Sequence, residues 1–279
     1  LDGPFLVESA GMRKVSEARS EVSVRTVPTD AAAFARTVGA PPSAVVTMAD
    51  APPPVRRGEG PLVVMLDPGH GGIDPGAERE GIREADLMLT FARELKEVLL
   101  RQDGVEVVLT RDEDVFVPLE ERVSMARAAG ADIFLSLHAD ALAEGRANGA
   151  TVYTLAEEAT DIASQKLAER HDRADLLAGV DLSETGDEVA LVLMDMARVE
   201  TRPRSDALAD AIVEGIREAT GSTYKTPRLE AGFSVLKAPD IPSVLIELGF
   251  LSSKRDREKM VDPEWRRQAA EGILESLGV

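Results

Sequence analysis

The sequence contains no cysteine, and this absence excludes several chemistries at once. Disulfide bonds, thiolate nucleophiles and zinc sites built on cysteine sulfur are all ruled out. Any transition metal must therefore be held by nitrogen and oxygen ligands. The lack of cysteine is compatible with either the cytoplasm or an oxidising compartment. Histidine is almost as scarce, with three in 279 residues, so the places where these three occur carry information.

Long apolar runs and an excess of basic residues are also missing. No run approaches the roughly 18 apolar residues of a membrane span, and the opening LDGPFLVESAG lacks the basic start and apolar core of a signal peptide. Acidic residues outnumber basic ones by 50 to 32, which gives a net charge of -18. This charge argues against sequence-independent binding to nucleic acid or anionic lipid. With 44% hydrophobic residues, the chain should bury a sizeable core in one large domain or two small ones.

The composition changes near residue 60. Residues 1–40 alternate weakly between apolar and polar side chains, as the remnant of a preceding β-rich module would. Residues 41–60 are rich in proline, alanine and glycine, the composition of an extended linker. We therefore expect one domain boundary near residue 60 and a second domain over residues 61–279.

In the second domain, short apolar runs alternate with segments whose apolar residues recur at the spacing of a helix. Strands are expected at 62–66, 105–110 and 132–138, with helices at 84–100 and 119–129, and this βαβαβ order predicts parallel strands joined by right-handed crossovers. A further strand is expected at 149–155, where an edge position in the sheet is one option. Helices are expected at 160–177, 187–199 and 205–219, with a break at Pro203 between the last two. Strands at 233–237 and 244–248 and a helix at 264–277 complete the expected elements. The fold class is α/β, with a single twisted, mostly parallel sheet and helices on both faces.

Two of the three histidines follow apolar strands. His70 lies in the glycine-rich turn after the strand at 62–66, and His138 ends the strand at 132–138. A lone histidine in such a turn is more often structural than functional. Two at matching strand ends point to a shared site, because the carboxyl ends of strands in an open α/β sheet are where ligands collect.

Two carboxylates stand where apolar elements meet loops. Glu84 opens the helix after the glycine-rich turn, and Glu247 lies late in the apolar run 243–248. A carboxylate buried in such a run needs a partner, a metal or a substrate. Two histidines and a glutamate form a three-ligand set for Zn²⁺ with a fourth position open to water. From residue type alone, iron or manganese remain alternatives.

Several segments together resemble the zinc-dependent N-acetylmuramoyl-L-alanine amidases of bacterial cell-wall turnover and cell division. They are VVMLDPGHGGIDPGA, READLMLTFARELKEVL, VVLTRDEDVFVPLEERVSMARAAGADIFLSLHADA and FSVLKAPDIPSVLIELGFLSS, in the family's order over about residues 61–279. The resemblance implies that His70, Glu84 and His138 bind one Zn²⁺ per chain and that Glu247 is the catalytic glutamate. The substrate implied is peptidoglycan, cut between the lactyl group of N-acetylmuramic acid and L-alanine. Leu248 departs from the family, which more often has threonine or serine there.

Three further polar residues lie close in sequence to these ligands. Asp67, Ser136 and Asp140 are candidates to orient the ligands by hydrogen bonds, and a role in turns or caps is an equal alternative for each.

The third histidine, His171, falls in a helical stretch where a solvated side chain is the simplest interpretation. However, residues of about 157–203 resemble the insert of division-associated family members, which folds over the active site and supplies a side chain to zinc. Those relatives mostly have Glu-Asn where this chain has His171-Asp172. We therefore predict that His171 is the fourth zinc ligand and that the enzyme is autoinhibited. The helix at 187–199 is then either a docking site for a protein activator or ordinary core packing.

Two other functions compete with the hydrolase. One is a catalytically silent, metal-containing protein that binds peptidoglycan or serves as a scaffold, against which the charge of Glu247 argues. The other is a phosphate-binding protein built on residues 69–72, which lacks the Lys-Ser/Thr pair of a P-loop. The resemblance also implies a location in the periplasm or cell envelope, where the substrate is. It implies as well that residues 1–40 are the end of a peptidoglycan-targeting module that precedes the catalytic domain.

Overall fold

The computed structural model describes residues 5–16, 19–28, 60–141, 148–156, 159–177 and 188–279. The chain divides into two compact units, Leu1–Arg57 and Gly58–Val279. In the first, β1 (Phe5–Ser16) and β2 (Arg19–Pro28) pair as an antiparallel hairpin. The linker expected over residues 41–60 lies almost entirely outside the described residues, as do residues 157–158 and 178–187 of the expected insert.

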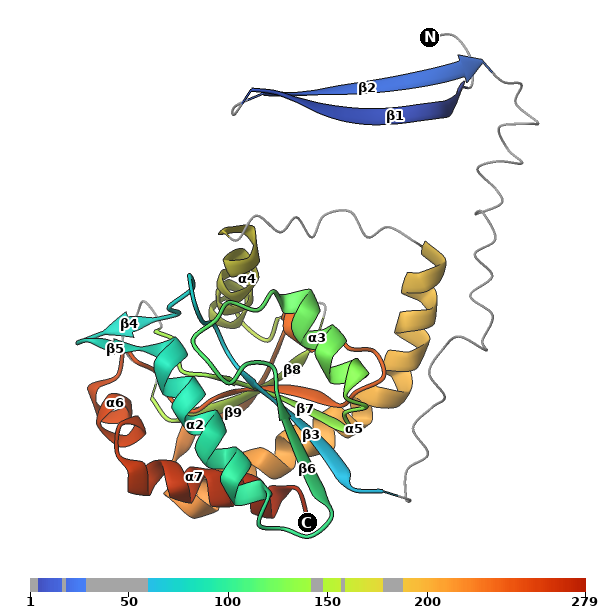
Figure 1. Cartoon of the computed structure of the whole chain (residues 1–279). Coiled ribbons are helices and arrows are strands. Elements are labelled where there is room, and N and C mark those ends of the chain that lie inside the picture. The colour runs from blue at the N-terminus through green and yellow to red at the C-terminus, as the bar shows by residue number, and fades with distance from the viewer. Residues whose placement is uncertain (1–4, 17–18, 29–59, 142–147, 157–158, 178–187) are drawn as a thin grey trace. The chain divides into compact units, whose positions relative to one another are not determined.

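The second unit is organised around a six-stranded sheet in the order β6-β3-β7-β10-β8-β9 (Figure 1). All neighbouring pairs are parallel except β10 and β8. This arrangement confirms the predicted fold class. The strands are β3 (Leu62–Pro68), β6 (Val105–Leu109), β7 (Ile133–His138), β8 (Ala150–Leu155), β9 (Thr223–Ala231) and β10 (Ser243–Glu247).

Helices cover both faces of this sheet because its central strands are apolar on both sides. Val64 and Leu66 of β3 contribute to one buried cluster, while Met65 between them contributes to the other. The first cluster lies under α2 (Glu84–Leu99), α5 (Glu188–Thr220) and α7 (Pro263–Ser276). The second lies under α3 (Leu119–Ala128) and α4 (Ile162–Leu177). A strand buried on both faces is nearly continuously hydrophobic, which is the pattern that β3 and β7 show.

The structure corrects the expected order of the last strands. β8 is not at an edge, since it lies between β10 and β9. The edge strand beside β8 is β9, and β6 forms the opposite edge. The sequence analysis missed β9 because its polar sequence TYKTPRLEA has no apolar run. The apolar residues expected as a strand at 233–237 form instead a short 3-10 helix, η1 (Ser234–Leu236).

The helices also differ from expectation near Pro203. A single helix, α5, runs through this proline, where a break between two helices was expected. A proline inside a helix removes one backbone hydrogen bond, and the packing of α5 against α7 and β8 outweighs that loss. A further short helix, α6 (Lys254–Met260), was not expected. None of the helices in the described part of the chain is long and apolar enough to span a membrane.

Candidate metal centre

Three adjacent strands bring the expected site residues to one edge of the sheet. His138 is the last residue of β7 and Glu247 the last of β10, and the two are paired in register. His70 follows β3, the strand on the other side of β7. The carboxyl ends of these parallel strands therefore present two imidazoles and a carboxylate side by side, as strand-end reasoning predicted.

Glu84 lies between the two strand-end histidines. It is the first residue of α2 and is completely buried. Its Oε1 lies 3.2 Å from His70 Nε2 and 3.2 Å from His138 Nδ1, and accepts a hydrogen bond of 2.8 Å from the backbone of Ala139. Burial alone would raise the pKa of Glu84, but the two histidines outweigh it and hold the pKa well below its usual value. The carboxylate is therefore ionised between both rings.

His70 has an unusual backbone conformation, with φ at 60°, a left-handed value that non-glycine residues seldom adopt. Its Nδ1 is 2.6 Å from Asp74 Oδ2, which fixes the ring and leaves Nε2 facing Glu84. Burial lowers the pKa of His70, but Glu84 and Asp74 together raise the pKa to about 10. Asp74 was not identified from the sequence, although it stands four residues after His70.

His171 reaches the same point from α4. Its side chain is 6% exposed, and its ring centroid lies 4.3 Å from that of His138 and 5.5 Å from that of His70. The Nε2 atom lies 3.9 Å from Glu247 Oε1, and the edge of the ring packs against Phe233. Burial and the two neighbouring histidines hold the pKa of His171 well below its usual value. The ring is therefore neutral, the form in which imidazole binds a metal.

Glu247 is held by one oxygen only. Its Oε2 accepts a hydrogen bond of 2.9 Å from the backbone of Asp140, while Oε1 is buried and makes no hydrogen bond within the described residues. Burial, with the negative charges of Glu84 and Asp140, raises the pKa of Glu247 well above its usual value. The free oxygen faces the histidine cluster.

Two features of the cluster suit a metal ion: buried polar atoms without partners, and ligand atoms that lie close together. Among the described residues, His70 Nε2, His171 Nε2 and Glu247 Oε1 are buried polar atoms without a hydrogen bond, and such atoms are costly unless something binds them. One ligand atom from each of His70, His138 and His171 lies within 4.8 Å of the others. Nitrogens that bind one Zn²⁺ tetrahedrally lie roughly 3.4 Å apart, so each of these atoms would need to move inward by less than about 1 Å to share an ion.

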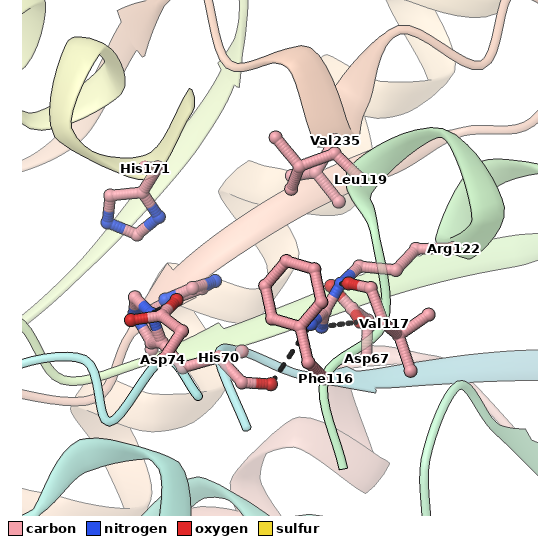
Figure 2. Close-up of a pocket in the computed structure, with 11 residues that line it drawn as sticks. Asp67, His70, Asp74, Phe116, Val117, Leu119, Arg122, His171 and Val235 are labelled. Atoms are coloured by element: carbon pink, nitrogen blue, oxygen red, sulfur yellow. Dashed lines mark hydrogen bonds and ion pairs between the residues drawn. The ribbon is translucent and has the colours of Figure 1, made fainter. Parts of the chain in front are cut away.

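Two buried arginines, Arg111 and Arg122, hold the loop that carries His70. Figure 2 shows Arg122 beside Asp67. Arg122 donates hydrogen bonds to the carbonyls of Pro68 and His70, and Arg111 donates to those of Pro68 and Gly69. Asp67 neutralises Arg122 across 2.7 Å. Burial would raise the pKa of Asp67, but Arg122 and the hydroxyls of Thr110 and Ser136 hold the pKa below its usual value. Neither arginine was identified from the sequence.

Comparison with known proteins decides the family. Residues 64–278 match the N-acetylmuramoyl-L-alanine amidase family. The chain belongs to this family. It is 37% identical over 230 residues to N-acetylmuramoyl-L-alanine amidase AmiC of Escherichia coli O6:H1, covering 81% of this chain and 54% of that protein. It is 35% identical to AmiA of Escherichia coli K12, covering 81% of this chain and 78% of that protein. The chain thus spans only about half the length of the AmiC relative.

Solved amidase structures share the fold of this amidase domain. N-acetylmuramoyl-L-alanine amidase AmiC2 of Nostoc punctiforme superimposes with a TM-score of 0.57 at 27% identity, covering 79% of this chain and 97% of that one. These comparisons confirm the family and the fold that the sequence motifs predicted.

The amidase domain brings together five of the residues singled out from the sequence: His70, Glu84, His138, His171 and Glu247. The three auxiliary candidates are placed differently. The Ser136 hydroxyl donates a hydrogen bond of 2.7 Å to Asp67, whose other oxygen binds Arg122. Asp140 donates its backbone N–H to Glu247 and pairs through its side chain with Arg170.

Proposed function

We propose that this chain is a zinc-dependent hydrolase of peptidoglycan. It cleaves the amide bond between the lactyl group of N-acetylmuramic acid and the L-alanine of the stem peptide. Family membership supports the reaction class, and relatives that include AmiA and AmiC carry the amidase name. The observation that carries the proposal is the convergence of His70, Glu84 and His138 beside the free oxygen of Glu247. Its substrate implies a location in the periplasm or cell envelope.

His70, Glu84 and His138 would hold one Zn²⁺ per chain. Glu84 Oε1 already lies at 3.2 Å from both rings, and Asp74 fixes the His70 ring from behind. This outer hydrogen bond orients a ligand and raises its basicity. A zinc ion in this place supplies Lewis acidity, which polarises the scissile carbonyl and acidifies water.

Glu247 is the group that moves the proton. Because the backbone N–H of Asp140 holds Oε2, Oε1 keeps a fixed direction toward the cluster. We assign to Oε1 the removal of a proton from the attacking water and its later delivery to the leaving alanine nitrogen. A carboxylate can carry out both steps without moving, since the oxygen that accepts the proton also donates it.

His171 would close the site in the resting enzyme. Its Nε2 is buried, makes no hydrogen bond within the described residues and belongs to the cluster of three histidines. As a fourth ligand it would occupy the position that water and substrate need. A hundredfold suppression requires only about 2.7 kcal/mol in favour of the closed state. A protein activator that binds the insert of about residues 157–203 and draws α4 away would then release the enzyme.

Digestion of purified peptidoglycan by the zinc-loaded chain tests these assignments. We expect strong release of stem peptides from His171→Ala, little from the unchanged chain and none from His171→Ala combined with Glu247→Ala. Lys166→Ala, an exposed residue of the same helix, is the matched control and should behave like the unchanged chain. Equal activity with and without His171 would keep the amidase and discard the lock. Peptidoglycan binding without cleavage in every variant would favour the catalytically silent alternative.

A further inference from the structure

A small pocket with a cavity volume of about 20 Å³ adjoins the histidine cluster on the side of α3. His70, His138 and His171 form one wall, and Phe116, Val117, Leu119 and Val235 form an apolar wall. Figure 2 shows these apolar side chains grouped on the side away from His171. Nothing assigned so far to the reaction uses this wall. Because the pocket shares His70, His138 and His171 with the cluster, a group bound in it would lie next to the proposed metal site.

The charges around this pocket are already balanced, which decides what it can take. Arg122 lines the pocket, but its Nη1 pairs with Asp67 at 2.7 Å and its Nε donates to the carbonyl of Val117. Besides the histidines and the Asp67–Arg122 pair, the pocket lining contains one more charged side chain, Asp74. Asp74 binds His70 Nδ1 and the backbone N–H of Gly76. Among the described lining residues outside the histidine cluster, an incoming carboxylate or ammonium would meet only charges that are already paired, and it would lose its hydration. The pocket is therefore suited to a small uncharged group.

We propose that this pocket is a subsite for a methyl group next to the scissile amide, and that Phe116 with Leu119 and Val235 selects substrates bearing it. This inference rests on the proposed function. The substrate of that reaction carries two such groups, the methyl of L-alanine on one side of the amide and the methyl of the lactyl ether on the other. Both have the chemistry that the pocket fits, and the experiment below separates them.

The test uses three synthetic N-acetylmuramoyl dipeptides. The first has the natural lactyl and L-alanine groups, the second has glycine in place of alanine, and the third has a glycolyl ether in place of the lactyl ether. All arms carry His171→Ala so that the insert does not suppress binding. We expect one of the two methyl deletions to lower kcat/KM about tenfold, the discrimination typical of one carbon in an apolar pocket. In Phe116→Ala the same deletion should change kcat/KM less than threefold.

Val115→Ala is the matched control, because Val115 precedes Phe116 but is 45% exposed and does not line the pocket. It should keep the full discrimination. Dissociation constants of the three compounds for zinc-loaded Glu247→Gln, with and without Phe116→Ala, provide a readout that does not need turnover. Binding that depends on one methyl and on Phe116 without any hydrolysis would refute the proposed function and keep the subsite. Discrimination that is absent, or unchanged by Phe116→Ala, would overturn the subsite whether or not the compounds are cleaved.

Discussion

Asp172 binds Ser234 through both of its carboxylate oxygens. The backbone N–H of Ser234 donates across 3.1 Å and its hydroxyl across 2.9 Å. On the other side of His171, Arg170 pairs with Asp140 at 2.7 Å and donates to the carbonyl of Ala141 at 3.0 Å. The two sequence neighbours of His171 therefore attach α4 to the segments around the histidine cluster, and they hold the imidazole where it meets the other two histidines.

Loss of either attachment should release the insert. A pair of hydrogen bonds contributes on the order of 1–2 kcal/mol, so Asp172→Ala and Arg170→Ala should raise amidase activity roughly five- to thirtyfold. Dye release from labelled peptidoglycan measures this, and hydrogen exchange over residues 162–171 should quicken in parallel. Lys166→Ala is again the control. If both variants hydrolyse peptidoglycan no faster than Lys166→Ala, these contacts do not restrain the insert.

Gly76 should be essential to the metal centre for a steric reason. A Cβ at this position would lie 2.7 Å from Glu84 Oε2 and 2.7 Å from the His70 ring. Gly76→Ala should therefore weaken zinc binding at least tenfold, as measured by competition with a chromogenic chelator. Gly81→Ala separates crowding from backbone strain, because Gly81 also has a positive φ but nothing within 4 Å of its Cβ. Equal loss of zinc in both variants would show that strain, not crowding, is responsible.

Arg122 should tune zinc affinity from a distance, because its guanidinium holds the carbonyls of Pro68 and His70. Arg122→Lys keeps the positive charge beside Asp67 but cannot reproduce the fork of donors. We expect zinc affinity to fall 10- to 100-fold, the usual effect of losing a group that orients a ligand. Arg127→Lys, an exposed residue of the same helix that pairs with Asp240, should leave the affinity unchanged. Unchanged affinity in Arg122→Lys would contradict the role of this arginine.

Asp67 should make stability depend on pH. The folded protein holds the pKa of Asp67 below its usual value, because the opposing effects of Arg122 and the two hydroxyls outweigh burial. Its contribution is therefore fully present above the unfolded pKa of about 3.9 and is lost as the pH falls through the lower folded pKa. Asp67→Asn should cost about 3–5 kcal/mol at pH 7 by leaving Arg122 without its partner. Urea unfolding should show a smaller difference from the unchanged chain near pH 3.

The control for this pH effect is Asp240→Asn, since Asp240 forms a half-exposed pair with Arg127. Its effect on the free energy of unfolding should stay within about 0.5 kcal/mol at both pH values. A cost for Asp67→Asn that does not shrink in acid would mean that Asp67 acts through shape and not through its charge.

The sequence predicted the residues at strand ends well, for a physical reason. A buried parallel strand is a short apolar run, and the residue where the run stops must lie at the carboxyl edge. His70, His138 and Glu247 all satisfy this rule, so their convergence followed from local patterns. Glu84 followed from its place at the start of α2. His171 could not be placed in this way, because the chain path that returns α4 to the cluster leaves no periodic signal.

Other parts depend on contacts that local patterns do not encode. Arg111 and Arg122 bind backbone carbonyls 42 to 54 residues earlier in the chain, and a carbonyl acceptor leaves no trace in the sequence. The course of α5 through Pro203 depends on tertiary packing, which outweighs the local tendency of proline to end a helix. The apolar residues of η1 looked like a strand because a run of this length is ambiguous between the two.

The position of β10 sets an order of events during synthesis of the chain. β10 lies between β7 and β8, although it is made after both, so the two earlier strands cannot pair with each other in the final sheet. A nascent chain that ends before residue 243 already contains His70, Glu84, His138 and His171, but neither its middle strand nor Glu247. All the residues proposed to bind zinc are therefore synthesised before Glu247, the residue proposed to transfer the proton. A chain truncated before residue 243 would therefore lose Glu247 together with the strand that joins β7 to β8, and the two parts of the sheet would have no shared partner.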